Sequence, residues 1–372
     1  MQLSVIILNY NVRYFLEQCV LSVQKALEGI DGEIIVIDNA SSDESCEMMK
    51  TKFPHIKLIE NKENLGFPKG NNIGVAQAKG EYICILNPDT VVAEDTFVKI
   101  LNTKNWTLNT GIIGCKLIDG AGNFLPESKR GVPTPWVAFT KIFGLYKISN
   151  YFGKYYAQHL SENESGKVDI LVGAFMVMKR ELYLEVGGFD ENCFMYSDDI
   201  DLSYLVLKTG KSNYYFHETS VIHYKGESTV RDGTYMKRFR EAMQFFYKKH
   251  FKKSWFFDVM MQVGSFVFSL LKKNQQKNEV RIIDEYVVFS KRNLELNLSK
   301  KATYLSDFNQ FVNQPKKNIE IIFDTATFSF AEIITFMQLN KSKNLSFKNY
   351  ISSSNYLIGS NNSNDRGQII LL

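Results

Sequence analysis

Four short apolar runs, each followed at once by polar residues, dominate the first ninety positions of the sequence. The runs are residues 3–8, 33–37, 56–59 and 82–86. Between them, apolar side chains such as Val12, Phe15 and Cys19 recur at helical spacing. Strands that alternate with helices in this way form a mainly parallel sheet with helices on its faces. The sequence therefore predicts an α/β fold.

Local signals indicate where further elements begin and end. Ser41 and Glu44 have the spacing of a capping box, which predicts a helix start there. Pro68 fits the first turn of a third helix, which Gly80 can end. The later chain is expected to form a buried strand with a glycine kink, a helix and one more strand, at residues 169–179, 198–209 and 214–223.

All four predicted strands end in polar side chains. These ends carry Asn9, Tyr10, Asn11, Asp38, Asn39, Glu60, Asn61, Asn87 and Asp89. Ligands of open parallel sheets bind outside the carboxyl ends of the strands. Ordinary polar loops would explain one or two of these ends. Because every end is polar after an apolar interior, we favour a site that several strands share.

Charge and cysteine content exclude several classes of protein. A net charge of +4 over 372 residues gives no support to nucleic-acid binding. The five cysteines include no C-x-x-C pair, so neither a disulfide framework nor a zinc site is expected. We therefore expect the protein to work in a reducing compartment. The apolar run at the N-terminus has the length of a strand and no preceding basic residues, so it is not a signal peptide.

The composition changes after about residue 230. Lysines and arginines flank an apolar stretch at residues 255–271, which carries Asp258 and Gln262 and is slightly short for a membrane span. A helix at the membrane interface and an ordinary buried helix both fit residues 231–278. Residues 279–372 have no chemical motif and predict a small β-α-β module for packing or oligomerisation.

The remaining carboxylates suggest where chemistry takes place. Asp198, Asp199 and Asp201 open a predicted helix, where negative side chains gain about 0.3–1 kcal/mol each from the helix dipole. The apolar residues 194–196 that precede them suit a general base. No glycine-rich phosphate loop and no G-x-S-x-G elbow is present. Carboxylates with a late histidine suit a divalent cation that neutralises a diphosphate.

At this point the chain resembles a family 2 glycosyltransferase of the GT-A fold, in its bacterial rhamnosyltransferase-like subgroup. The matching segments, in family order, are residues 4–11, 35–43, 64–67, 70–71, 87–89, 187–190 and 198–202. Each segment is weak alone, and the ordered series is specific. The resemblance covers residues 1–230 as a catalytic domain and does not extend to residues 279–372.

The resemblance implies a role for each matching position. Asp38 would bind the base of a nucleotide-sugar donor. Four residues near it would also contact the donor: Asn9, Tyr10, Asn11 and Asn39. Gly66 and Asn71 would lie along the nucleotide. Asp89, with Asn87 before it, would hold Mg²⁺ or Mn²⁺ on the diphosphate, and His223 would complete that metal site. Asp199, next to Asp198, would be the general base of an inverting transfer.

Two positions depart from the family pattern. Asn87 replaces an aspartate, and its neutral side chain is a weaker ligand for a cation. Asp198 replaces a glutamate, which keeps the charge and shortens the reach. Two other functions are alternatives. A sugar nucleotidyltransferase would carry a glycine-rich, arginine-containing loop, which is absent at Asn9–Asn11, and the other alternative is a non-catalytic carbohydrate-binding or scaffold relative.

The expected partners follow from the same resemblance. The donor would be a UDP- or dTDP-sugar, and the acceptor a glycan or lipid-linked glycan of cell-surface polysaccharide biosynthesis. The expected location is cytoplasmic, and peripheral contact with the inner face of the plasma membrane is the alternative that residues 231–278 suggest.

Overall fold

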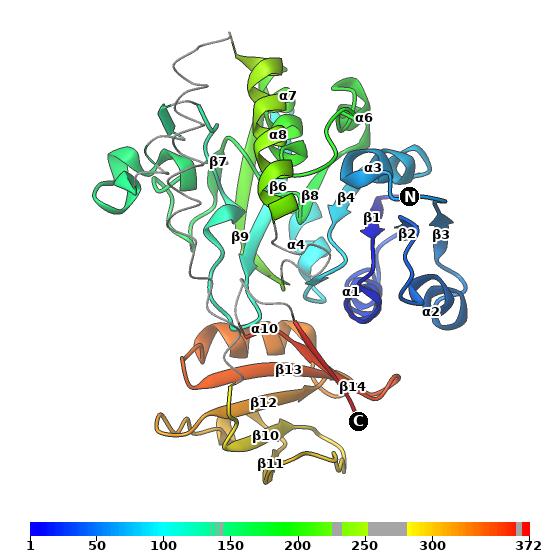
Figure 1. The fold of residues 1–372 in the computed structure, drawn as a ribbon, viewed down its shortest axis with the longest axis vertical. Coiled ribbons are helices and arrows are strands. Elements are labelled where there is room, and N and C mark those ends of the chain that lie inside the picture. The colour runs from blue at the N-terminus through cyan, green and yellow to red at the C-terminus, as the bar shows by residue number, and fades with distance from the viewer. Residues whose placement is uncertain (135, 138–139, 141–143, 225–232, 252–280, 362–366) are drawn as a thin grey trace.

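The computed structural model describes residues 1–134, 136–137, 140, 144–224, 233–251, 281–361 and 367–372 (Figure 1). These residues form two sheets. The strands of the larger sheet are β1 (Leu3–Asn9), β2 (Gly32–Asp38), β3 (Lys57–Glu60), β4 (Tyr82–Leu86), β5 (Thr90–Val91), β6 (Thr110–Ile118), β7 (Gly166–Val168), β8 (Phe175–Lys179) and β9 (Ser212–His223). They lie in the order β3-β2-β1-β4-β8-β6-β9-β5, and β7 pairs with β9.

Helices cover the larger sheet on both faces. They are α1 (Arg13–Ala26), α2 (Ser45–Lys52), α3 (Gly66–Ala76), α4 (Thr96–Leu101), α6 (Arg180–Glu185), α7 (Asp198–Lys208) and α8 (Gly233–His250). Strands β3, β2, β1 and β4 are parallel to one another, and β8 is antiparallel to both β4 and β6. The predicted α/β fold class is therefore confirmed, with a parallel half and a mixed half.

The smaller sheet belongs to a C-terminal module. Its strands are β10 (Glu285–Phe289), β11 (Ala302–Leu305), β12 (Ile319–Asp324), β13 (Leu345–Ile351), β14 (Tyr356–Gly359) and β15 (Gln368–Leu371), in the order β11-β10-β12-β13-β14-β15. Helix α10 (Phe330–Leu339) lies between this sheet and the larger domain (Figure 1). The expected β-α-β unit is present as β12, α10 and β13, and the run expected at residues 356–359 is β14. Three strands that we did not predict, β10, β11 and β15, extend the sheet.

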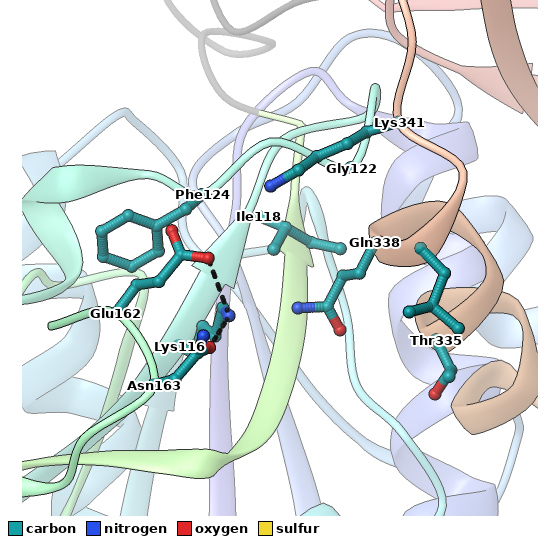
Figure 2. Close-up of a pocket in the computed structure, with 10 residues that line it drawn as sticks. Lys116, Ile118, Gly122, Phe124, Glu162, Asn163, Thr335, Gln338 and Lys341 are labelled. Atoms are coloured by element: carbon teal, nitrogen blue, oxygen red, sulfur yellow. Dashed lines mark hydrogen bonds and ion pairs between the residues drawn. The ribbon is translucent and has the colours of Figure 1, made fainter.

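The module shares a hydrophobic core with the larger domain. Val12, Phe15 and Tyr224 of the larger domain belong to the same buried cluster as Phe330 and Ile333 of α10. The carboxylate of Glu94 accepts hydrogen bonds from the first two amides of α10, at 2.8 and 2.9 Å. A cavity remains between α10 and the end of β6 (Figure 2). The module is thus docked onto the carboxyl-end side of the larger sheet.

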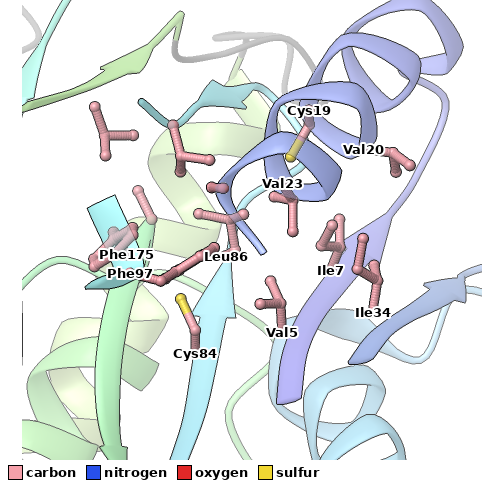
Figure 3. Packing of buried hydrophobic residues seen from close by; sticks show 14 of the residues in the cluster. Val5, Ile7, Cys19, Val20, Val23, Ile34, Cys84, Leu86, Phe97 and Phe175 are labelled. Carbon is pink, nitrogen blue, oxygen red and sulfur yellow. The ribbon is translucent and has the colours of Figure 1, made fainter. Parts of the chain in front are cut away.

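Helix α1 closes one face of the parallel strands (Figure 3). Cys19, Val20 and Val23 of α1 face Val5 and Ile7 of β1 and the neighbouring strand β4, and all are fully buried. Burying a side chain of this size contributes about 1.5–3 kcal/mol. Cys19, Cys84 and Cys115 are buried and all five cysteines are free thiols, as the sequence predicted. This packing buries one face of β1 and β4.

Two predicted element boundaries are wrong. Helix α2 begins at Ser45, and no side chain caps it, because Ser41 binds Asp38 and Asn9 instead. The capping-box pattern was therefore part of a loop. The strand predicted over residues 169–179 begins only at Phe175, because the residues before it turn toward α7 and give the Gly173 amide to Asp199.

The basic helix α8 packs within the larger domain. Met243, Phe246 and Tyr247 contact Ile170 and Ile200 in one buried cluster. In the part of the chain that the structure describes, no helix is both long enough and apolar enough to cross a membrane. The apolar stretch at residues 255–271 lies outside the described residues, so the interfacial helix stays a prediction.

Candidate active site

The ends of β1 and β2 are tied together by buried polar side chains. Asn9 donates from Nδ2 to Oδ1 of Asp38 at 2.8 Å, and the amide of Ser41 donates to Oδ2 of Asp38 at 2.7 Å. Asp38 is only 2% exposed. Oδ1 of Asn9 is buried and has no hydrogen-bond partner among the described residues. Oδ1 of Asn9 is therefore available to accept a hydrogen bond from a ligand.

The predicted loop positions beside Asp38 are brought together as expected. Asn11 has a φ of 54°, a left-handed conformation that asparagine tolerates better than most residues. Its Oδ1 accepts the amide of Ser42 at 2.7 Å. Tyr10 is half-buried between Asn9 and Asn11. The buried side chain of Asn39 accepts a hydrogen bond from Asn61 at 2.8 Å, so it links the ends of β2 and β3.

The start of α3 lies against the loop that leads into α7. Gly66 has a φ of +81°, and a Cβ there would lie 2.7 Å from the carbonyl oxygen of Phe194. Asn71 donates to the carbonyl of Phe67 at 2.9 Å, and its own Oδ1 is buried without a partner in the described part of the chain. Glycine at position 66 thus permits the close approach between the start of α3 and the loop that leads into α7.

The end of β4 brings Asn87, Asp89 and His223 together. Thr90 of β5 pairs with His223 of β9, which places the imidazole beside Asp89. Nε2 of His223 lies 3.4 Å from Oδ1 of Asp89 and 3.4 Å from Nδ2 of Asn87. These separations are longer than a well-formed hydrogen bond. Oδ1 of Asp89, Oδ1 of Asn87 and Nδ1 of His223 are buried without hydrogen bonds to any described residue.

This group of three side chains fits a hard divalent cation that a ligand helps to hold. Its donors are a carboxylate, a carboxamide and an imidazole. Among the residues that the structure describes, no group of three or more His, Cys, Asp or Glu side chains converges. Mg²⁺ is commonly bound by one or two carboxylates together with substrate phosphates. The unpartnered oxygens of Asp89 and Asn87 are consistent with such an incomplete site.

Asp199 is held in a fixed orientation at the start of α7. Its Oδ2 accepts hydrogen bonds from the Arg130 guanidinium at 2.5 Å and from the Gly173 amide at 3.1 Å. A Cβ on Gly173 would lie 3.3 Å from Cβ of Asp199, so glycine allows this close approach. Oδ1 of Asp199 is not engaged by any hydrogen bond of the described residues. One oxygen is anchored and the other is free to accept a proton.

Asp198 differs from its neighbour because it forms no ion pair with a described residue. Burial, and next the negative charge of Asp199, raise the pKa of Asp198 to about 7, and the charge of Arg130 lowers this pKa by less than they raise it. Asp201, by contrast, is paired with Lys249 at 2.8 Å and with His250 at 2.5 Å on α8. The three aspartates of this helix therefore have different environments, and the ion pairs of Asp201 connect α7 to α8.

The three groups of side chains share one edge of the larger sheet. The Asn87 amide donates to the carbonyl of Ala174 at 3.1 Å, and Gly173, the residue before Ala174, binds Asp199. The pairing of β1 with both β2 and β4 places Asn9 and Asp38 on the other side of Asn87. The order along the edge is Asn9 and Asp38, then Asn87 with Asp89 and His223, then Asp198 and Asp199.

Arg130 is the residue of this site that the sequence did not reveal. It is 8% exposed, lies in a stretch without clear periodicity, and its guanidinium also donates to the carbonyl of Leu171 at 2.9 Å. A buried carboxylate needs a counter-ion, so the sequence indicates that some lysine or arginine lies beside Asp199. It did not indicate which of the 44 lysines and arginines supplies the charge.

Comparison with known proteins bears on the family of the chain. Residues 4–187 match the model of glycosyl transferase family 2. An N-acetylglucosaminyl-diphospho-decaprenol L-rhamnosyltransferase of Mycobacterium tuberculosis is 26% identical over 241 residues, 62% of this chain and 78% of the relative. Rhamnosyltransferase WbbL of Escherichia coli is 28% identical over 222 residues, 54% of this chain and 78% of the relative.

A third relative extends the likeness toward the C-terminus. The minor teichoic acid biosynthesis protein GgaB of Bacillus subtilis is 22% identical over 328 residues, 86% of this chain and 32% of the relative. A match of that extent must run into residues 279–372, since these make up about a quarter of the chain. The resemblance that we noted over residues 1–230 therefore continues into the C-terminal module in this relative.

Proposed function

We propose that this chain, which belongs to glycosyl transferase family 2 over residues 4–187, moves a sugar from a nucleoside diphosphate to a hydroxyl group of a glycan or lipid-linked acceptor. Glycosyl transfer is the activity of the family, and the rhamnosyltransferases among the relatives support the subgroup. The donor, the acceptor, the stereochemistry and the metal are our proposals, and each is argued from the edge of the larger sheet.

One observation carries the proposal: the catalytic edge holds a row of buried polar atoms that the described residues leave without hydrogen bonds. They are Oδ1 of Asn9, Oδ1 of Asn71, Oδ1 of Asn87, Oδ1 of Asp89 and Nδ1 of His223. Buried polar atoms in folded proteins are nearly always hydrogen-bonded. A ligand with hydroxyl groups, a base and a cation-bound diphosphate would supply partners along this row.

The donor nucleotide is proposed to lie over the ends of β1, β2 and α3. Asp38 is anchored by Asn9 and Ser41, and a carboxylate has further lone pairs for the N–H groups of a base. The half-buried ring of Tyr10 offers an apolar surface beside it. We assign Asn11, Asn39, Gly66 and Asn71 to the same nucleotide side, and propose a UDP- or dTDP-sugar as the donor.

Asp89, His223 and Asn87 would hold Mg²⁺ or Mn²⁺ at the donor diphosphate. Bound there, the cation would neutralise charge on the leaving diphosphate. The protein contributes a site that is rigid before ligands arrive, because Asp89 and His223 are each 6% exposed and Thr90, the residue after Asp89, pairs with His223. Asn87 contributes a neutral oxygen, so most of the negative charge at this position comes from Asp89.

Acceptor activation is proposed for Asp199, with Asp198 beside it. Arg130 and the Gly173 amide hold Oδ2, which leaves Oδ1 to take the proton of the acceptor hydroxyl. The acceptor oxygen then forms a bond to the anomeric carbon while the bond from that carbon to the diphosphate breaks. One in-line displacement inverts the anomeric carbon and releases the nucleoside diphosphate.

The location of the reaction is a separate proposal. The name of the mycobacterial relative places its acceptor on a decaprenyl diphosphate, which is a lipid. We propose cytoplasmic transfer with peripheral contact to the membrane through the segment that follows residue 250. Co-sedimentation with anionic vesicles tests this contact, and full retention of binding after deletion of residues 252–277 would contradict it.

Thermal-shift measurements with UDP-, dTDP- and GDP-sugars and Mn²⁺ test the proposed function. A ligand that binds only the folded state raises the melting temperature with its concentration and affinity. We expect one nucleotide class to stabilise the chain, EDTA to reduce the shift, and Asp89→Asn to remove the metal-dependent part. Stabilisation by a nucleoside triphosphate with pyrophosphate release would instead indicate a nucleotidyltransferase. Sugar binding without donor turnover would indicate a non-catalytic relative.

A further inference from the structure

A cavity of about 280 Å³ lies where the C-terminal module meets the larger domain (Figure 2). The larger domain contributes Lys116, Ile118 and Phe124 from the end of β6 and the loop after it, and Glu162 and Asn163 from the loop before β7. The C-terminal end of α10 and the residue pair after it contribute Thr335, Gln338, Leu339 and Lys341. We call this space the α10 cavity. Two parts of the chain that are distant in sequence build it.

The α10 cavity has an excess of positive charge. Lys116 is 7% exposed, and its ammonium donates to Oδ1 of Asn163 at 2.6 Å and lies 3.4 Å from Oε1 of Glu162. The charge of Lys116 is therefore matched by Glu162. Lys341 points into the same space in Figure 2 and forms no ion pair with any described residue. With two ammonium groups and one carboxylate, the cavity favours an anion.

The remaining lining suits a sugar. Gln338 directs its carboxamide toward the cavity and has no hydrogen-bond partner in the described part of the protein. A carboxamide both donates and accepts, as a sugar hydroxyl requires. The ring of Phe124 stands at one wall, fixed edge-to-face against the buried ring of Tyr215 at 6.5 Å. Ligand pockets span about 300–1,000 Å³, so a cavity of about 280 Å³ suits one small ring.

The cavity lies beside the catalytic edge. Ile118 lines it and pairs with Ile222, the residue before His223. Strand β6 also stands between β8, which follows Gly173, and β9. A chain of sugars that places one hydroxyl at Asp199 would therefore have a neighbouring unit near the end of β6.

We propose that the α10 cavity binds one anionic sugar unit of the acceptor, a hexose that carries a phosphate group, while transfer takes place at the sheet edge. Lys341 and Lys116 would contact the phosphate, and Gln338 and Phe124 would contact the ring. The assignment of this unit to the acceptor rests on the proposed function, whereas the binding itself does not. Under this proposal the C-terminal module takes part in acceptor binding, because Gln338 and Lys341 both belong to it.

Titration calorimetry of the full chain, without donor, tests the proposal with glucose 1-phosphate, glucose and inorganic phosphate. We expect glucose 1-phosphate to bind at least tenfold more tightly than glucose or phosphate. Lys341→Gln should weaken it at least fivefold, and Lys343→Gln, an exposed lysine that does not line the cavity, should not. Gln338→Ala should weaken glucose 1-phosphate and leave phosphate unchanged. Equal affinity for phosphate and glucose 1-phosphate would overturn the sugar assignment.

A further variant separates this proposal from the proposed function. Asp89→Asn should abolish metal-dependent donor binding and leave the affinity for glucose 1-phosphate as in the unaltered protein. If Asp89→Asn removes glucose 1-phosphate binding, or Lys341→Gln leaves it intact, the ligand is at the sheet edge and the α10 cavity proposal is wrong. If no donor binds but glucose 1-phosphate still depends on Lys341, the proposed function fails and the cavity assignment stands.

Discussion

Polar side chains follow strands in both sheets, and two buried aspartates, Asp324 in the module and Asp89 in the larger domain, differ in how completely they are hydrogen-bonded. In the module, Asp324 at the end of β12 is fully buried and bound on both oxygens. Arg292 donates to them at 2.8 and 3.0 Å and Ser290 at 2.9 Å. In the larger sheet, Asp89 after β4 is also buried, and its Oδ1 has no hydrogen bond to a described residue.

This difference distinguishes a closed edge in the module from the edge of the larger sheet that we propose as the binding edge. Polar strand ends occur in both sheets, so polarity alone does not identify a site. A buried acceptor without a partner costs about 1–3 kcal/mol. The larger sheet keeps several such atoms at one edge, whereas Asp324 closes the module edge with its own neighbours. Several such atoms gathered at one edge are therefore where we expect a ligand, whereas single ones, such as Nζ of Lys348 and Oδ1 of Asn361 in the module, carry no such expectation.

The largest expected effect comes from the anchored carboxylate of the binding edge. Asp199→Asn should lower the transfer rate by about 10²–10⁴-fold, the usual contribution of a general base, because an amide cannot take the acceptor proton. Donor binding, measured by thermal shift, should persist. Asp95→Asn, which removes an exposed aspartate paired with Lys99, serves as the control.

Loss of folding must be distinguished from loss of the base. Asp199→Asn leaves the Arg130 guanidinium buried without its counter-ion, which by itself is strongly destabilising. The double variant Arg130→Met with Asp199→Asn has no unpaired buried charge at this pair. If this variant binds donor and still transfers sugar at the normal rate, Asp199 is not the base.

The core of the fold follows from the sequence because it depends on local patterns. The run at residues 82–86 is β4, and residues 3–8 and 33–37 lie within β1 and β2. These strands are apolar on both faces, so burial identifies them without knowledge of their neighbours. The strand β6 was not predicted although all of it is buried, because Gly111, Gly114 and Lys116 interrupt its apolar pattern.

The binding edge could be predicted only in part, for a related reason. Asn9, Asp38, Asn87 and Asp89 follow predicted strands directly, so the sequence places them on one edge. The counter-ion of Asp199 lies 69 positions away along the chain, in a stretch without periodicity. Likewise, the contact of Glu94 with α10 joins residues 236 and 237 positions apart. Such pairs depend on tertiary packing, which no local pattern records.

The next effect concerns the pH dependence of stability, and it arises at Asp198 of the larger sheet's edge. The pKa of Asp198 rises from 3.8 to about 7 through burial and the charge of Asp199, so the folded chain favours the protonated form. In the unfolded chain this carboxyl ionises near its ordinary value. Its contribution to stability is therefore present below about pH 4 and is lost as the pH rises through 7. The loss amounts to up to about 4 kcal/mol.

Asp198→Asn should remove this loss because an amide does not ionise. Chemical denaturation at several pH values between 4 and 8 measures the free energy of unfolding. We expect the stability of the variant relative to the unaltered chain to increase steadily from pH 4 to pH 8. Asp95→Asn should show no such trend. A constant difference across this pH range would contradict the raised pKa of Asp198.

The smallest effect compares the two edges directly with one isosteric change at each. Asp324→Asn weakens the hydrogen bonds from Arg292 and Ser290, so the free energy of unfolding should fall by about 1–3 kcal/mol. Asp89→Asn replaces a carboxylate whose Oδ1 accepts no hydrogen bond from a described residue and lies 3.4 Å from Nε2 of His223, so stability without ligand should fall by less than in Asp324→Asn. Donor-induced stabilisation should show the reverse pattern, lost in Asp89→Asn and kept in Asp324→Asn. Equal destabilisation by both changes would mean that Asp89 is structural, and the distinction between a binding edge and a closed edge would fail at the residue on which it depends most.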